Sequence, residues 1–195
     1  EAVVVGRHSK GRIASTVLGS TSAQVAANAH APVIVVDNQT EVRSGKPVVV
    51  GVDGSPANRA AITYAFEAAQ RGSVPLTALY AWRLDLPEQA ALPYLSRDTL
   101  RALFQEQTRV LHEALAGYTH DYPDVHVRYL VSRQPPVARL VNEAQSASLL
   151  VMGSRGRGGF RGLLLGSTSQ GVLHRALPCP IAIVHDRDRA TSDTS

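Results

Sequence analysis

Residues 150–168 read LVMGSRGRGGFRGLLLGST, and the arrangement of the rest of the chain can be worked out from them. An apolar run typical of a buried strand ends at Gly153, and Gly166-Ser167-Thr168 begins thirteen residues further on, where a helix is expected to start. A second apolar run, PIAIVH from Pro180, follows that helix. Strand, glycine-rich loop, helix and strand in this order predict two parallel strands joined by a helical crossover.

The same pattern occurs at the start of the chain. Residues 3–21 read VVVGRHSKGRIASTVLGST, again with Gly-Ser-Thr thirteen residues after the first glycine, and PVIVVD from Pro32 corresponds to PIAIVH. The match needs one extra residue in the second copy, near Leu177. Strand and helix signals precede the second copy but not the first. We therefore predict the C-terminal remnant of a first domain at 1–38, a linker at 39–46, a complete domain at 47–185 and a disordered tail at 186–195.

Strand and helix signals alternate through residues 47–185. Apolar runs predict strands at Pro47–Val52, Leu76–Trp82, Val125–Val131, Leu149–Met152 and Ile181–Val184. Helical spacing predicts helices at Ala60–Gln70, Arg97–Ala116, Pro136–Gln145 and from Ser167 to about Ala176, and Arg83–Ser96 is interpreted as a mobile loop. This alternation predicts a Rossmann-like α/β fold, a three-layer sandwich with a five-stranded, mostly parallel sheet.

Two segments are expected at the same edge of this sheet. Asp53 directly follows the first strand and Gly153 follows the fourth, and ligands of such sheets bind outside the carboxyl ends of the strands. Asp53 can also cap the turn before Pro56, and the two roles are compatible. Ser55 is expected to cap a helix that has Pro56 at its first position.

The spacing Gly153-x2-Gly156-x9-Gly166-Ser167 predicts a site for a polyphosphate. Glycine allows the backbone to approach a ligand closely, and the start of a helix offers unpaired N–H groups and partial positive charge. The loop also carries cationic side chains, at Arg155, Arg157 and Arg161. It lacks the lysine of a P-loop and does not match the dinucleotide fingerprint.

Three stretches together resemble the universal stress protein family: VVVGVDGS at 48–55, LYAW at 79–82, and Met152-Gly153-x2-Gly156-x9-Gly166-Ser167-Thr168. The resemblance covers nearly all of 47–185, and 1–37 resembles the end of a second such domain. It implies an ATP-binding domain like that of the adenine nucleotide alpha hydrolases, often present in tandem and dimerising through its last strand.

The resemblance also implies which residues contact the nucleotide. Asp53 would contact the ribose or the adenine, and the backbone of Ala81 would contact the adenine. The phosphates would lie against Gly166, Ser167 and Thr168. The full implied set is Gly51, Asp53, Ala81, Met152, Gly153, Arg155, Gly156, Gly166, Ser167 and Thr168. No catalytic residue and no metal ligand of the protein is expected, although Mg²⁺ could accompany ATP.

Dimerisation in this family suggests how the two copies interact. Either a homodimer or an intramolecular pseudo-dimer is expected, through Ile181, Ala182, Ile183 and Val184 and their counterparts Val33, Ile34, Val35 and Val36. The first copy has Ser9 in place of the second glycine, and no strand followed by an aspartate precedes it. We predict that Glu1–Asp37 cannot form a site alone.

These observations favour an ATP-binding regulatory module in a stress response. The alternatives are a slow ATPase or nucleotide hydrolase and an interaction scaffold that binds no nucleotide. Hydrolysis usually needs a positioned base and a metal clamp, so at most weak turnover is expected. A nucleic-acid site is not favoured, because the arginines lack interleaved aromatic residues on which bases could stack. ATP is preferred over other adenine nucleotides because the loop suits a triphosphate.

Composition sets the remaining limits. The 195 residues are 44% hydrophobic and 18% charged, with a net charge of +4, which fits a globular domain. No run of about 20 apolar residues is present, so no membrane span is expected. Cys179 is the single cysteine, which excludes an internal disulfide and suits a reducing compartment, so a cytoplasmic location is expected.

Overall fold

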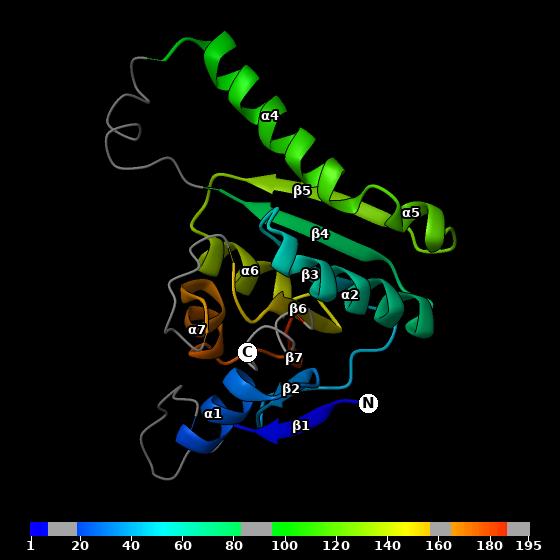
Figure 1. Ribbon diagram of the computed structural model, residues 1–195, viewed down its shortest axis with the longest axis vertical. Coiled ribbons are helices and arrows are strands. Elements are labelled where there is room, and N and C mark those ends of the chain that lie inside the picture. The colour runs from blue at the N-terminus through cyan, green and yellow to red at the C-terminus, as the bar shows by residue number, and fades with distance from the viewer. Residues whose placement is uncertain (8–18, 83–94, 157–164, 187–195) are drawn as a thin grey trace, which may run out of the picture.

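The computed structural model describes residues 1–7, 19–82, 95–156 and 165–186 (Figure 1). The predictions for Ser9, Arg157, Arg161, most of the loop at 83–96 and nearly all of the tail lie outside these residues. The first segment contains β1 (Val3–Gly6), α1 (Ser20–Asn28) and β2 (Val33–Val36). The later strands are β3 (Val48–Val52), β4 (Leu76–Ala81), β5 (Val127–Ser132), β6 (Leu149–Gly153) and β7 (Ile181–Val184). The later helices are η1 (Pro56–Asn58), α2 (Arg59–Gly72), α4 (Arg97–Leu115), α5 (Tyr118–Asp121), α6 (Pro136–Ala144) and α7 (Ser167–Leu173).

The strands form one sheet in the order β1-β2-β7-β6-β3-β4-β5. All neighbouring strands are parallel except β2 and β7, which pair antiparallel with Val33 opposite Ile183 and Val35 opposite Ile181. The predicted α/β class is confirmed. The sheet has seven strands, however, because β1 and β2 extend the five strands of residues 47–185 across the apolar edge of β7.

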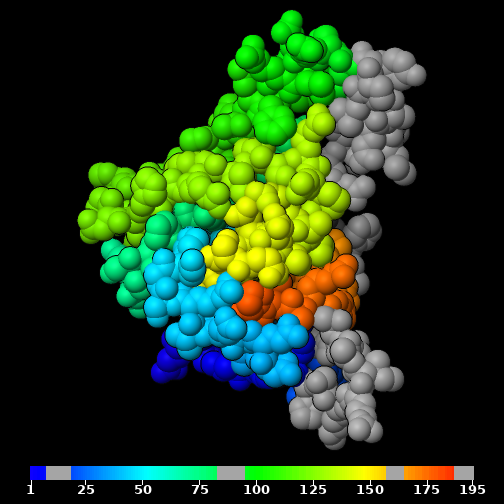
Figure 2. Space-filling model, turned by 180° about the vertical axis from the view of Figure 1, so that it is seen from behind, coloured from blue at the N-terminus to red at the C-terminus, as the bar shows by residue number. Residues whose placement is uncertain are grey.

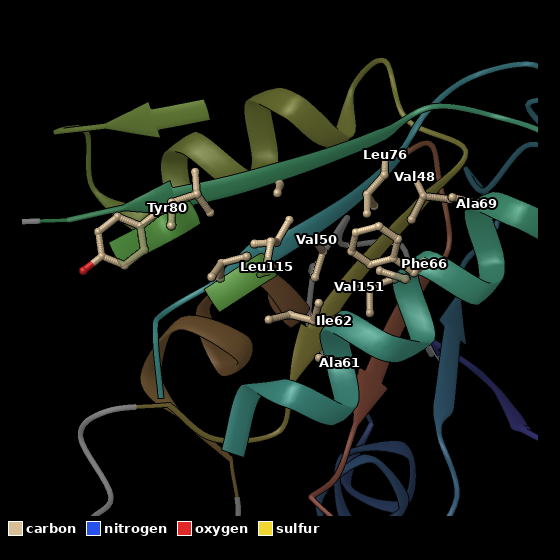
Figure 3. Packing of buried hydrophobic residues seen from close by; sticks show 14 of the residues in the cluster. Val48, Val50, Ala61, Ile62, Phe66, Ala69, Leu76, Tyr80, Leu115 and Val151 are labelled. Atoms are coloured by element: carbon tan, nitrogen blue, oxygen red, sulfur yellow. The ribbon is translucent and has the colours of Figure 1, made fainter. Parts of the chain in front are cut away.

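Helices cover both faces of the central strands, which explains why those strands are continuous apolar runs in the sequence. On one face α2 places Ala61, Ile62 and Phe66 against Val50 and Val151 of the sheet (Figure 3). On the other face α1, α6 and α7 pack over a second cluster that includes Leu140, Leu150 and Leu173. Each apolar side chain of the central strands therefore has a helix to pack against.

The repeat seen in the sequence is also present in the hydrogen bonds. Ser22 Oγ donates to the Gly6 carbonyl at 2.8 Å, and Ser169 Oγ donates to the Gly153 carbonyl at 2.7 Å. The first segment lies directly against the C-terminal part of the chain, as the blue and orange-to-red surfaces show in Figure 2. The unit β1-α1-β2 thus repeats β6-α7-β7, including the hydrogen bond from the helix serine to the strand-ending glycine.

The element boundaries differ from the expected ones where tertiary contacts intervene. Strand β5 begins at Val127, because Val125 closes a turn by donating its N–H to the Tyr122 carbonyl. Helix α7 ends at Leu173 and not near Ala176. The short helix α5, where Tyr118 stacks on Phe66, was not predicted. Among the described residues, no helix has the length and hydropathy needed to cross a bilayer.

Candidate functional site

The candidate site is a crevice at the carboxyl ends of β3, β4 and β6. Strand β3 lies between β6 and β4, and the chain leaves β3 toward α2 on one face of the sheet. It leaves β6 toward α7 on the opposite face. Such a reversal opens a gap between neighbouring strands, and this gap is where open α/β sheets bind ligands.

A cavity of about 510 Å³ occupies this crevice. Its lining includes all the residues that the family resemblance implied, which are Gly51, Asp53, Ala81, Met152, Gly153, Arg155, Gly156, Gly166, Ser167 and Thr168. Tyr80 and Trp82 also line the cavity, and the sequence left two roles open for them, core packing and lining for a base. Further lining residues were not singled out for nucleotide contact in the sequence: Val52, Asn58, Leu79, Pro136, Leu140, Leu165 and Ser169. The structure therefore brings together residues from five separate stretches of the chain.

The loop between β6 and α7 forms one wall. Its two ends meet, because the Gly166 N–H donates to the Ser154 carbonyl at 2.8 Å. Gly166 is the N-cap of α7 in an extended conformation, and within the described part of the chain no side chain caps this helix start. The first-turn N–H groups of Ser167 and Thr168 therefore lie at the cavity without a side-chain cap.

Asp53 lies on the opposite wall and caps the turn before Pro56, which is one of the two roles that the sequence allowed; its contact with a ligand stays a prediction. Its Oδ1 accepts a hydrogen bond from the Ser55 N–H at 2.8 Å, in a turn where Gly54 has the left-handed φ of 75°. Its other carboxylate oxygen lies so close to Gly156 that a Cβ there would collide with it. Ser55 is the N-cap residue of η1 with Pro56 at the start of the helix, as predicted, but its side chain makes no capping hydrogen bond.

Two buried polar residues, Asn58 and Ser169, support the walls, and the sequence did not single out either of them. Asn58 is 2% exposed; its amide donates to the Gly51 carbonyl at 3.1 Å and accepts from the Asp53 N–H at 3.4 Å. Ser169 is 4% exposed and ties the first turn of α7 to the Gly153 carbonyl. Asparagine and serine are common in turns and helix starts, so only their burial distinguishes these two.

The far end of the cavity is apolar. Leu79, Leu140 and Met152 come from β4, α6 and β6 and are all buried. Tyr80 and Trp82 line the cavity and also belong to the hydrophobic core. The indole N–H of Trp82 is buried and has no hydrogen-bond partner among the described residues. One end of the cavity is thus suited to a flat apolar group.

The described cavity lining contains two charged side chains. Among the described lining residues, Arg155 is the cation and Asp53 the anion. His185, just beyond β7, is half-buried, and its ring nitrogen Nε2 lies 3.2 Å from the Ala27 carbonyl. Burial lowers the pKa of His185 below its ordinary value, and the charges of Arg155 and His30 lower it further. The described residues contain no group of three or more His, Cys, Asp or Glu side chains able to hold a metal ion.

Comparison with known proteins identifies what the chain resembles. The model of the universal stress protein family matches residues 1–37 and 45–185. A universal stress protein of Mycolicibacterium smegmatis is 42% identical over 189 residues, which are 95% of this chain and 62% of that protein. One from Mycobacterium tuberculosis is 41% identical over 180 residues, covering 88% of this chain and 55% of the relative. The chain therefore spans little more than half the length of these curated relatives.

A solved structure shows the same fold. The crystal structure of a universal stress protein from Archaeoglobus fulgidus superposes with a TM-score of 0.62. It covers 96% of this chain, which corresponds to 61% of the archaeal chain, at 21% sequence identity.

Proposed function

The chain belongs to the universal stress protein family, and we propose that it is an ATP-binding regulatory module of a cytoplasmic stress response. In this proposal ATP occupies the crevice at the ends of β3, β4 and β6. Its occupancy would alter the surface around the cavity and so change which protein partner binds.

The phosphates are assigned to the glycine wall. The backbone at Gly153, Gly156 and Gly166 can approach a ligand closely, and the first turn of α7 presents its N–H groups toward the cavity. The guanidinium of Arg155 supplies a charge of the right sign beside them. Donors of this kind, arranged around one cavity, are suited to a chain of phosphate groups.

The base is assigned to the apolar end. Leu79, Leu140 and Met152 offer buried surface for a flat ring, and Ala81 offers backbone groups at the end of β4. The Asp53 carboxylate also lines the cavity, and a carboxylate can accept hydrogen bonds from ribose hydroxyls. The cavity volume of about 510 Å³ lies within the usual range for small-molecule sites, roughly 300–1,000 Å³.

One observation carries the proposal. Residues 51–53, 81, 152–153, 155–156 and 166–168 come from separate stretches of the chain, yet they line a single cavity at the point where the connections reverse. Fold similarity alone would not imply a ligand. The residues that the sequence motifs indicate for nucleotide contact support the proposal because they meet in one place.

The same geometry supports binding more than turnover. Asp53 is the one carboxylate among the described lining residues, and it already accepts the Ser55 N–H. A base that activates water would need to be available to take a proton. Mg²⁺ could enter with ATP and would then neutralise part of the phosphate charge.

We also propose that residues 1–38 are the C-terminal part of a preceding domain of the same kind and dock as in a pseudo-dimer. The repeat makes Val33 equivalent to Ile181 and Val35 to Ile183. In the sheet Val33 lies opposite Ile183 and Val35 opposite Ile181. If each residue is replaced by its equivalent in the other copy, the same pairs result. This is the property of a pseudo-two-fold axis that passes between Ile34 and Ala182.

The proposed ligand is tested by measuring what the purified protein carries. The protein is denatured, and released nucleotides are identified by chromatography and mass spectrometry, beside Gly166→Asp and Gly166→Ala variants. A Cβ at Gly166 makes only ordinary contacts, the nearest at 3.5 Å from the Arg155 Cα, so both variants should fold. The carboxylate should weaken ATP binding by at least about 100-fold through like-charge repulsion.

The two variants separate charge from bulk. Near-stoichiometric ATP or ADP in the wild type, loss in Gly166→Asp and retention of most binding in Gly166→Ala would support the phosphate wall. Excess ADP would point to turnover. A wild type that is empty and also fails to bind added ATP would overturn the nucleotide proposal.

A further inference from the structure

Asn58 occupies the point where two strands of the sheet separate. Strands β3 and β6 are paired only as far as Val50 and Val151. Beyond this point they diverge to form the crevice, which leaves backbone groups at the end of β3 without a partner strand on that side. Asn58 supplies both kinds of missing partner, because its amide donates to the Gly51 carbonyl and accepts from the Asp53 N–H.

The amide also contacts the other side of the gap. A Cβ placed on Gly153 would lie 3.4 Å from Nδ2 of Asn58, so the side chain packs directly against the end of β6. The Asn58 side chain is 2% exposed and is therefore shielded from water. In the protein interior a hydrogen bond is stronger than in water, and an unpaired polar group costs more free energy. Asn58 therefore contacts both walls of the cavity, at the end of β3 and at the end of β6.

The consequence concerns Asp53. Its N–H is held by Asn58 and its Oδ1 by the Ser55 N–H, so both its backbone and its side chain are fixed. The remaining carboxylate oxygen then lies against Gly156 on the opposite wall. Among the side chains of the same shape, asparagine, aspartate and leucine, only asparagine offers a donor and an acceptor together. Aspartate would place an acceptor against the Gly51 carbonyl, and leucine would satisfy neither group.

We propose that Asn58 is a positioning residue for the nucleotide, acting through Asp53, whose carboxylate it holds in place for the ligand. The assignment rests on the proposed function. It differs from a merely structural role, which would lower stability without depending on the carboxylate of Asp53.

A double-mutant cycle tests this. Affinity for ATP is measured by titration calorimetry for the wild type, Asn58→Ala, Asp53→Ala and the double variant. We expect Asn58→Ala to weaken ATP binding by about tenfold, because buried backbone groups lose their partners and Asp53 is held less firmly. In the Asp53→Ala background the same change should weaken binding by less than about twofold. If Asn58→Ala does not fold, Asn58→Ser is used in the same cycle.

Ser169→Ala is the matched control. Ser169 is also buried and supports Gly153, but its hydroxyl donates to the Gly153 carbonyl and not to Asp53. Its effect on affinity should be the same whether or not Asp53 is present. Equal losses for Asn58→Ala in both backgrounds would overturn the Asn58 assignment alone. A wild type that binds no ATP would overturn the assignment together with the proposed function.

Discussion

Strands β1 and β6 share one local pattern but have different surroundings. Each is followed by a helix whose serine hydroxyl returns to the strand's terminal glycine, Gly6 or Gly153. Strand β6 lies between β3 and β7 and ends at the cavity, whereas in the described part of the chain β1 pairs with β2 alone. Its outer residues Val3 and Val4 are 40% and 64% exposed. The glycine loop after β6 is thus one wall of the site, and the neighbouring strand β3 supplies the other wall.

The residue that follows the strand-ending glycine differs between the two copies. Ser154 is buried and its carbonyl closes the glycine loop. Its counterpart Arg7 lies 3.5 Å from the Asp37 carboxylate and donates to the Arg175 carbonyl at 2.6 Å. Burial lowers the pKa of Arg7 below its ordinary value. The first copy therefore uses this position to attach itself to the second, and its lack of an independent site remains a prediction.

The largest expected effect comes from the strands that join the copies. Val35 of β2 is 2% exposed beside β7, so Val35→Asp should destabilise the protein by about 3 kcal/mol or more, because it buries an unpaired charge. Val4→Asp on the exposed edge should change stability by less than about 0.5 kcal/mol. Urea denaturation measures both. Equal losses would show that β2 is no better integrated than β1.

A smaller effect is expected where α7 packs on α6. A Cβ at Gly171 would lie 2.7 Å from Val137 Cγ2, whereas the equivalent Gln24 of α1 is exposed. Gly171→Ala should cost about 1–2 kcal/mol, because the clash outweighs a helix-propensity gain of about 1 kcal/mol. Adding Val137→Ala should restore part of it. Gln24→Ala should be neutral in the same thermal melts, and a stabilised Gly171→Ala would contradict the close packing.

The two strand-ending glycines give the most direct comparison. A Cβ on Gly153 would lie 3.0 Å from the Arg155 carbonyl, but a Cβ on Gly6 would meet nothing within 4 Å. Gly153→Ala should lower stability by about 1 kcal/mol and weaken ATP binding, while Gly6→Ala should change neither. Chemical denaturation and ATP titration of the pair decide this. Loss of ATP binding in Gly6→Ala would place a ligand contact in the first copy.

The smallest effect is a pH dependence at the junction of the copies. Because the pKa of His185 is lowered in the folded protein, the unfolded chain binds its proton first as the pH falls. The contribution of neutral His185 is complete above its ordinary pKa and is lost below it, by at most about 1.4 kcal/mol per pH unit. His185→Gln should reduce the fall in melting temperature between pH 7.5 and 5. An unchanged fall would assign it to other groups.

Much of the site was predictable because its chemistry is local in the sequence. Gly153, Gly156 and Gly166 follow an apolar run at fixed spacing, and Asp53 follows another, so local pattern alone places Gly153 and Asp53 at strand ends and Gly166 at a helix start. Asn58, Ser169 and Gly171 could not be singled out, since nothing nearby in the sequence indicates that they are buried or closely packed. The pairing of β2 with β7 joins segments about 150 residues apart; the family resemblance suggested this pairing, but it left open whether the two strands belong to one chain or to two.

Periodicity and turn residues were sufficient for the α/β class, the order of strands and helices, and the two copies of the glycine pattern, because all of these follow from the preferences of neighbouring residues. The packing of distant segments formed the cavity beside β6. Strand β6 has β3 beside it, so Asp53 and Asn58 approach its glycine loop. The physical reason is that a binding site needs walls from both sides of a gap in the sheet, and such a gap exists only after the strands have paired.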